Sequence, residues 1–149
     1  MKKIFFFDID NTLLDHASQR IPDSALEAIA KLKVAGHTIA IATGRGYDHA
    51  REFVAQVQPD YAITQNGARV LRGEEVVSKK ALDPVAMRRL FQLMLAKGFQ
   101  YGVNNGHVGR VSADVPDVSR PLESVAIAVQ TDPEFYQGQD VFQGWMFFH

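Results

Sequence analysis

Short apolar runs alternate with helical patterns over the first 65 residues of the chain. Residues 3–8, 38–42 and 61–64 are mostly apolar without a break, which is typical of strands buried on both faces of a parallel sheet. Between them, residues 23–36 and 47–57 carry apolar side chains at helical spacing. This order of elements predicts two successive right-handed βαβ units. The first part of the chain is therefore predicted to be an α/β fold with a parallel sheet.

The ends of the first helix are marked by residues of the right type. Asp23 belongs to the residues that cap helix N-termini, and Gly36 to those that close C-termini. We expect Asp23 to cap this helix and Gly36 to end it.

The alternation changes after residue 67. Asp83 followed by Pro84 predicts the start of a helix that reaches Gly98. Asn105-Gly106 suits a tight turn in which both residues have positive φ. The other apolar runs predict two hairpins and two further strands: 68–71 with 76–79, 99–103 with 108–112, then 125–129 and 141–148. This second part is predicted to be α+β, with the boundary between the parts near residues 66–82.

Composition restricts the class of protein. The 149 residues are 46% hydrophobic and 22% charged, as in ordinary globular domains. Sixteen basic and seventeen acidic residues give a net charge of -1 without a block of like charges, which argues against a nucleic-acid partner. The absence of cysteine excludes disulfides, thiolate zinc sites and cysteine nucleophiles, and fits the cytoplasm. The longest apolar run, residues 4–7, is too short to span a membrane, so we expect a soluble cytoplasmic protein without a membrane partner.

Polar residues follow each of the three predicted parallel strands. The carboxyl ends of parallel strands meet at one edge of the sheet, where open α/β sheets bind their ligands. Three segments are therefore predicted to form one site: Asp8-Ile9-Asp10-Asn11-Thr12, Thr43-Gly44-Arg45 and Gln65-Asn66-Gly67.

The chemistry of these residues points to phosphate. Asp8 and Asp10 can direct both carboxylates into one volume, where two anions need a cation or a shared proton. Oxygen ligands suit Mg²⁺. One carboxylate can attack phosphorus to form an aspartyl-phosphate, and the other can give and take the proton. The Thr43 hydroxyl, the amides of Gly44 and Arg45 and the Arg45 guanidinium suit a bound phosphate.

Each motif alone has a simpler interpretation. A lone D-x-D is common, Thr-Gly-Arg can be a strand-to-helix turn, and Asn-Gly can be a hairpin turn. Gly44-x-Gly46 lacks the third glycine of a dinucleotide-binding fingerprint, and the five histidines show no H-E-x-x-H spacing. The motifs become a specific sequence signal only when all three segments occur together in this order.

Together the three motifs resemble those of the haloacid dehalogenase superfamily. Residues 7–14 resemble its first motif, D-x-D-x-T-L, and residues 42–45 resemble the second motif of the Cof-like, type IIB-capped hydrolases. Residues 66–68 are similar to the N-G-A that leads from the core to the cap in that group.

The resemblance implies how the chain is organised. Residues 1–68 would be the N-terminal portion of a doubly wound, Rossmann-like parallel-sheet core. Residues 69–82 would be a hairpin and the linker from core to cap, and residues 83–149 a partial α+β cap domain.

The resemblance also implies a role for each matched residue. Asp8 would be the nucleophile and a Mg²⁺ ligand, and Asp10 the acid/base, with its backbone carbonyl also on the metal. The remaining matched residues would steady the loop or contact the phosphoryl group and substrate: Thr12, Thr43, Gly44, Arg45 and Asn66. The implied reaction is hydrolysis of phosphate monoesters of small metabolites, such as sugar phosphates or phosphorylated cofactors. Asn11 replaces the commoner glycine, and Asn tolerates the left-handed backbone.

Two further family motifs, a lysine and G-D-x-x-N-D, have no counterpart, since no Gly-Asp-x-x-x-Asp occurs after Asn66. The chain also ends in an apolar run, residues 144–148, whereas natural termini are usually polar. We therefore expect a truncated chain with half a catalytic core, part of a cap and little or no activity by itself. In the family the first strand is central, so we expect its edge to be unpaired here and the chain to self-associate through it.

Other functions stay open at this point. A sugar phosphomutase of the same superfamily would require a bisphosphate activator. A non-catalytic protein would bind a phosphorylated metabolite without turning it over. A glycosyltransferase D-x-D site fits less well, because only seven residues precede Asp8.

Overall fold

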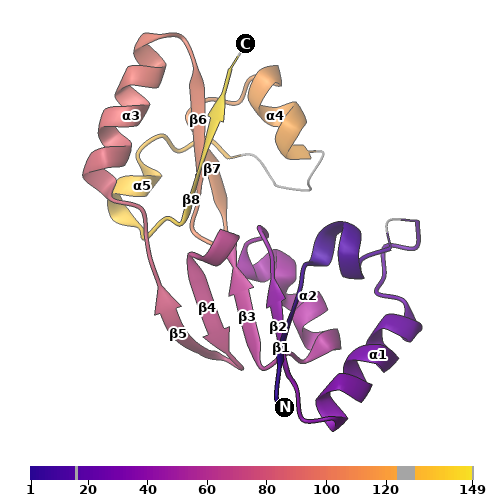
Figure 1. Cartoon of the computed structure of the whole chain (residues 1–149). Coiled ribbons are helices and arrows are strands. Elements are labelled where there is room, and N and C mark those ends of the chain that lie inside the picture. Colours follow the sequence, from indigo (N-terminus) through magenta and orange to yellow (C-terminus); the bar gives the residue numbers. More distant parts are fainter. Residues whose placement is uncertain (16, 124–129, 149) are drawn as a thin grey trace. The chain divides into compact units, whose positions relative to one another are not determined.

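The computed structural model describes residues 1–15, 17–123 and 130–148 (Figure 1). The chain divides into two compact units, Met1–Lys79 and Lys80–His149. The strand predicted over residues 125–129 lies outside the described residues. Within the part of the chain that the structure describes, no helix combines the length and the apolar character needed to cross a membrane.

The first unit is built on a five-stranded sheet with the order β1-β2-β3-β4-β5. The first three strands run parallel, as two βαβ units predict, and the predicted hairpin adds two antiparallel strands to the same sheet. The strands are β1 (Ile4–Phe7), β2 (Thr38–Ala42), β3 (Tyr61–Thr64), β4 (Arg69–Arg72) and β5 (Glu75–Lys79).

The two helices of this unit, α1 (Asp23–Val34) and α2 (Tyr47–Val57), pack on the same face of the sheet. Two right-handed crossovers that step in the same direction across a sheet place both helices on one side. The shared core joins side chains from the two helices and from the first two strands: Phe5, Phe7, Ile29, Ile39, Ile41 and Phe53.

β1 lies at the edge of the sheet, and only one of its faces is covered. Phe5 and Phe7 pack in the core, whereas Ile4 is 56% exposed and Phe6 is 62% exposed. The prediction that residues 3–8 are buried on both faces is therefore wrong. A continuous apolar run indicates a strand, but it does not indicate whether neighbours are present on both faces.

The first helix begins differently from the prediction. Pro22 is the N-cap of α1, and Asp23 is its first residue and makes no capping hydrogen bond. The prediction that Asp23 caps the helix is wrong. Its carboxylate instead lies in the first turn, where a negative charge interacts favourably with the helix dipole and stabilises the helix. Gly36 ends the helix as predicted: its φ is +80°, and the next amide, of His37, donates to the carbonyl of Leu32 over 3.1 Å.

The second unit contains a three-stranded antiparallel sheet with the order β7-β6-β8. α3 (Pro84–Ala96) begins as predicted, because Asp83 accepts hydrogen bonds from the amides of the first turn. The other elements are β6 (Gln100–Asn104), β7 (Gly109–Val111), α4 (Pro116–Glu123), α5 (Phe135–Gly138) and β8 (Gln143–Phe147). The predicted second hairpin and C-terminal strand are thus confirmed, the strand with shorter bounds.

The turn of that hairpin differs in detail. Gly106 has a positive φ of 94°, but Asn105 is not among the residues with positive φ. The Asn105 side-chain oxygen instead accepts from the amides of His107 and Val108, at 3.0 and 2.9 Å. The prediction of positive φ at both Asn105 and Gly106 is therefore wrong for Asn105, whose side chain holds the loop instead.

An aromatic cluster forms the centre of the second unit. The rings of Phe91 and Tyr101 stack with their centroids 3.9 Å apart, and Tyr136 packs edge-on against Phe91. The Tyr101 hydroxyl donates to the carbonyl of Pro133 over 2.9 Å. Burial, with a smaller contribution from Tyr136 and nearby acidic groups, raises the pKa of Tyr101 to about 12.

Candidate active site

The carboxyl ends of β1, β2 and β3 bring the three predicted segments together. The Thr43 amide donates to the carbonyl of Ile63 over 2.9 Å, and the Asn66 amide donates to the carbonyl of Thr43 over 3.2 Å. The Gln65 amide donates to the carbonyl of Arg45, also over 2.9 Å. The second and third segments are therefore fastened to each other by their main chains.

The first segment turns back immediately after β1. Asp8 is still extended, and its Oδ1 accepts from the Ile9 amide over 2.8 Å. The wide turn η1 (Ile9–Leu13) follows, and the Leu14 amide closes it on the carbonyl of Ile9. Asn11 has a φ of 57° within this turn, which confirms that it takes the left-handed backbone expected where glycine is commoner.

An ion pair joins the first segment to the second. Arg45 donates from Nη2 to Oδ1 of Asp10 over 2.7 Å and from Nε to Oδ2 over 3.0 Å. The guanidinium also lies over the ring of Phe53, 4.9 Å from its centroid. The hydrogen bond to Asp10 raises the pKa of Arg45 above its ordinary value despite partial burial, and the charges of Asp10 and Asp8 add to this effect. Arg45 is therefore the counter-ion of the acidic pair.

Thr43 is buried at the end of β2, and its hydroxyl oxygen accepts from the Arg45 amide over 3.1 Å. This amide is thus engaged within the loop. α2 begins only at Tyr47, with Gly46 as its N-cap. The predicted role of the Arg45 amide at a helix N-terminus therefore has no direct geometric support, whereas the guanidinium does face the acidic pair.

Gly44 and Asn66 are in close contact. A Cβ atom added at Gly44 would lie 3.0 Å from Oδ1 of Asn66, which is closer than ordinary van der Waals contact. Asn66 itself has a φ of 55°, in the left-handed region. The absence of a side chain at Gly44 therefore allows the Asn66 amide to lie over the loop that follows β2.

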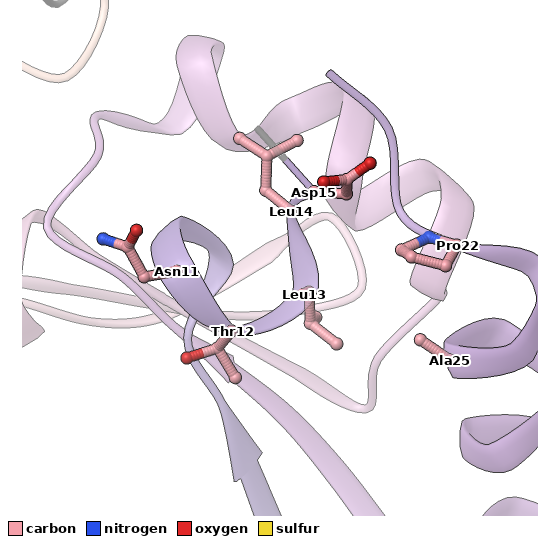
Figure 2. Close-up of a pocket in the computed structure, with 7 residues that line it drawn as sticks. All are labelled: Asn11, Thr12, Leu13, Leu14, Asp15, Pro22 and Ala25. Atoms are coloured by element: carbon pink, nitrogen blue, oxygen red, sulfur yellow. The ribbon is translucent and has the colours of Figure 1, made fainter. Parts of the chain in front are cut away.

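Thr12 lies in the same turn as Asp10. Its side chain is exposed and borders a hollow of about 360 Å³, shown in Figure 2. The residues that line this hollow include none of the other predicted site residues: they are Asn11, Thr12, Leu13, Leu14, Asp15, Pro22 and Ala25. Thr12 therefore belongs to the turn after β1, in keeping with a role in the loop.

Gln65 lies at the site, but its sequence position did not indicate an individual role for it. Its side chain is 1% exposed, and within the described residues neither Nε2 nor Oε1 has a hydrogen-bond partner. It also has a positive φ of 54°, directly before Asn66. Its place among polar residues at the end of β3 was the only sequence signal for it.

The acidic pair suits a hard cation by the chemistry of its donors. Among the described residues, no group of three or more His, Asp or Glu side chains is gathered to hold a metal ion. Mg²⁺, however, is commonly held by one or two carboxylates together with waters and substrate phosphate oxygens. Asp8 and Asp10 supply oxygen donors of that kind.

Two carboxylates after the first of three parallel strands, with a threonine and an arginine after the second, form an arrangement whose chemistry suits phosphoryl transfer. The comparison with known families agrees. The model of the haloacid dehalogenase-like hydrolases matches residues 5–125, and the chain belongs to this family.

Three individual relatives carry names that describe phosphatases. The candidate phosphatase YkrA of Bacillus subtilis is 32% identical over 149 residues, which are 97% of this chain and 57% of that protein. The phosphatase BT1666 of Bacteroides thetaiotaomicron superposes with a TM-score of 0.88 at 25% identity, over 99% of this chain and 56% of its own. A subclass IIB sugar phosphatase, BT4131, superposes with a TM-score of 0.74 at 28% identity, over 97% of this chain and 57% of its own.

These matches confirm the family and the predicted fold, a Rossmann-like core followed by part of a cap. The chain spans a little over half the length of each of these three relatives.

Proposed function

We propose that the chain carries the nucleophile-bearing portion of a Mg²⁺-dependent phosphatase. It would hydrolyse phosphate monoesters of small metabolites, a sugar phosphate or a phosphorylated cofactor, through an aspartyl-phosphate. The observation that carries this proposal is the position of Asp8 at the end of β1, beside the pair of Asp10 and Arg45 and the loop that begins with Thr43. The names of relatives such as YkrA and BT4131 support it.

In the first step, a carboxylate oxygen of Asp8 attacks the phosphorus atom. The bond between phosphorus and the ester oxygen breaks, and its electron pair leaves with that oxygen. Asp10, in its protonated form, donates a proton to the leaving oxygen, so the metabolite departs as an alcohol and the phosphoryl group stays on Asp8.

In the second step, water attacks the phosphorus atom and gives its proton to the Asp10 carboxylate. The bond between phosphorus and the Asp8 oxygen breaks, which restores the Asp8 carboxylate and releases inorganic phosphate. The Thr43 hydroxyl contacts the phosphoryl group in both steps, and Arg45 and Asn66 lie near the substrate.

The ion pair sets a condition on proton transfer. Both carboxylate oxygens of Asp10 accept hydrogen bonds from Arg45 in this structure. Each oxygen keeps a second lone pair, but proton exchange with the leaving oxygen or with water competes with these hydrogen bonds and becomes easier when one of them opens. The substrate phosphate provides a competing anion for the guanidinium, because Arg binds phosphate and carboxylate oxygens with the same fork of donors.

The metal would be held by the Asp8 carboxylate and the backbone carbonyl of Asp10, an atom that the pair with Arg45 does not use. When bound, Mg²⁺ would neutralise charge between the carboxylate and the phosphate. We place the protein in the cytoplasm, with a small phosphorylated metabolite as ligand and neither nucleic acid nor membrane as partner. The balanced charge and the absence of cysteine support this placement.

Beryllofluoride tests the proposed role of Asp8, because with Mg²⁺ it adds to a nucleophilic carboxylate as an acyl-phosphate mimic. We expect the 149-residue chain to bind it in calorimetry only when Mg²⁺ is present. Asp8→Asn abolishes this binding. The matched control Asp23→Asn, at a carboxylate that caps nothing in α1, keeps it. Binding that survives Asp8→Asn would exclude Asp8 as the nucleophile.

A further inference from the structure

The side chain of Gln65 differs from the other buried polar side chains of the described residues. Among those residues, four polar side chains are 5% exposed or less: Thr43, Thr64, Gln65 and Asn104. In three of them the side-chain oxygen takes part in a hydrogen bond with a main-chain group. Gln65 is the exception, because neither its Nε2 nor its Oε1 has a partner among the described residues.

The amide of Gln65 requires a partner of some kind. A primary amide carries two N–H donors and an oxygen with two lone pairs. Burying it without partners costs the hydration that it loses, and an apolar side chain of the same length would avoid that cost. Buried polar side chains are therefore nearly always bonded to protein groups or to internal water. The partner of Gln65 is to be sought outside the described side chains and main chain.

The chemistry of this position selects water as the ligand. The ligand must accept from Nε2 and donate to Oε1, and it must be small, because Gln65 is only 1% exposed. It must also be neutral, since a single neutral amide does not compensate the desolvation of an ion. Internal waters meet these conditions, and folded proteins hold roughly one per 27 residues, each with about three hydrogen bonds.

The main chain beside Gln65 offers acceptors for a further hydrogen bond from such a water. The Arg45 carbonyl accepts from the Gln65 amide over 2.9 Å, and the Thr43 carbonyl accepts from the Asn66 amide over 3.2 Å. Each of these bonds uses one of the two lone pairs of its carbonyl oxygen. A water on the Gln65 side chain therefore has carbonyl lone pairs close by in the same pair of segments.

The backbone at this place needs an anchor. Gln65 and Asn66 have φ values of 54° and 55°, so two consecutive residues other than glycine lie in the left-handed region, which L-residues disfavour. A side chain that is held by hydrogen bonds in the interior opposes the return of this turn to an ordinary conformation. The turn in turn carries Asn66, whose Oδ1 lies over Gly44.

We propose that Gln65 binds an internal water molecule, which accepts a hydrogen bond from Nε2 and donates one to Oε1. The hydrated amide anchors the left-handed turn that carries Asn66 between the loop after β2 and the start of β4. Water would bind here whatever reaction the whole protein catalyses, so the test requires no activity.

A crystal structure of the 149-residue chain at a resolution that shows ordered waters tests the site directly. We expect one water oxygen within about 3.2 Å of both Nε2 and Oε1. In solution, the side-chain amide protons of Gln65 are expected to show a nuclear Overhauser effect to a long-lived water. The exposed Gln92 of α3 shows none and is the control. An amide that bonds to a protein group, or that has only apolar neighbours and no water, would overturn the proposal.

Gln65→Met gives a second test, because it keeps the length of the side chain and removes both amide groups. We expect the equilibrium constant for unfolding in urea to rise on the order of tenfold, since the hydrogen bonds to the water are lost. Gln92→Met, at the exposed control position, changes it less than about twofold. An amide without any partner predicts the opposite sign, so a Gln65→Met chain more stable than the wild type would refute the bound water.

Hydrogen exchange tests the anchoring of the turn separately from overall stability. We expect Gln65→Met to speed exchange of the Asn66 main-chain amide on the order of tenfold through local opening. The control is the Asp60 amide, which donates to the Ile39 carbonyl over 2.8 Å at the other end of β3 and keeps its rate. Equal acceleration of the two amides would assign the effect to general destabilisation and refute the anchor.

Discussion

Arg45 binds both carboxylate oxygens of Asp10, a residue 35 positions earlier in the chain. The pair connects the loop after β1 to the loop after β2, and the ring of Phe53 supports the guanidinium from α2. The site is thus held together by charge before any ligand is present, and the residue proposed as acid/base is not free in solvent.

A double-mutant cycle measures this connection. We expect Arg45→Met and Asp10→Asn each to destabilise the first unit, with a coupling energy of about 0.5–1 kcal/mol, because the pair is bidentate but partly exposed. Chemical denaturation followed by circular dichroism gives the four free energies of unfolding. Arg51→Met, at an exposed position of α2, is the control. A coupling energy near zero would show that the pair is not maintained in solution.

The 149-residue chain itself is expected to show little or no phosphatase activity. The resemblance implies a lysine and a further acidic motif that these residues do not contain. Phosphoryl transfer depends on charge neutralisation and positioning, and one lost electrostatic group typically lowers the rate on the order of 10²–10³-fold. An aryl phosphate assay with Mg²⁺ checks this, with an active full-length family phosphatase as the positive control. Ordinary turnover that Asp8→Asn removes would contradict the expectation.

The sequence predicted most of the fold because its local signals agree with one another. Continuous apolar runs located β1, β2 and β3, and Gly36 and the Asp83-Pro84 pair located helix ends. It also predicted that Asp8, Thr43 and their neighbours gather at one sheet edge, since that follows from strand direction alone.

The features that the sequence did not predict depend on contacts that a residue's neighbours in the sequence do not determine. The exposure of Phe6 reflects the uncovered sheet face opposite α1 and α2, whereas the continuous apolar run predicted burial on both faces. The pair of Arg45 with Asp10 forms between side chains that meet only after the sheet has formed. The fold also buries the side-chain amide of Gln65, which has no hydrogen-bond partner among the described residues. Pro22, and not Asp23, is the N-cap of α1, a shift of one residue that the local sequence did not indicate.

Lys33 fastens the end of α2 to α1. Its Nζ donates to the carbonyls of Val57 and Gln58, both over 2.7 Å. We expect Lys33→Met to lower the free energy of unfolding by about 1–2 kcal/mol, since it removes a charged donor from two carbonyls at a helix C-terminus. Lys31→Met, at an exposed position in the same last turn of α1, is expected to change it by less than about 0.5 kcal/mol. Thermal or urea unfolding compares the two, and equal effects would mean that the Lys33 contacts contribute nothing specific.

Tyr101 is expected to make the second unit sensitive to alkali. Its pKa of about 12 in the folded chain lies above the ordinary value of 10.0, so the folded state disfavours the phenolate. The resulting stabilisation is complete below pH 10 and is lost as the pH rises from about 10 to about 12. The fluorescence of Trp145, the single tryptophan, reports unfolding of this unit.

In Tyr101→Phe the ring still stacks on Phe91, but there is no hydroxyl to ionise. This variant is expected to lose the part of the pH dependence between about 10 and 12 that Tyr101 contributes. An unchanged slope in that range would assign the dependence to other groups.

Because Gly44 and Asn66 are in close contact, the residue type at one of these positions limits which residue types the other can accept. With Oδ1 of Asn66 only 3.0 Å from the place of a Cβ at residue 44, no side chain can be added there unless residue 66 gives way. In a library randomised at both positions, we expect alanine or serine at residue 44 to be recovered only together with glycine at residue 66. Glycine also accepts the φ of 55° that Asn66 adopts. The residue types at positions 44 and 66, which lie more than twenty residues apart in the sequence, would then change together during evolution.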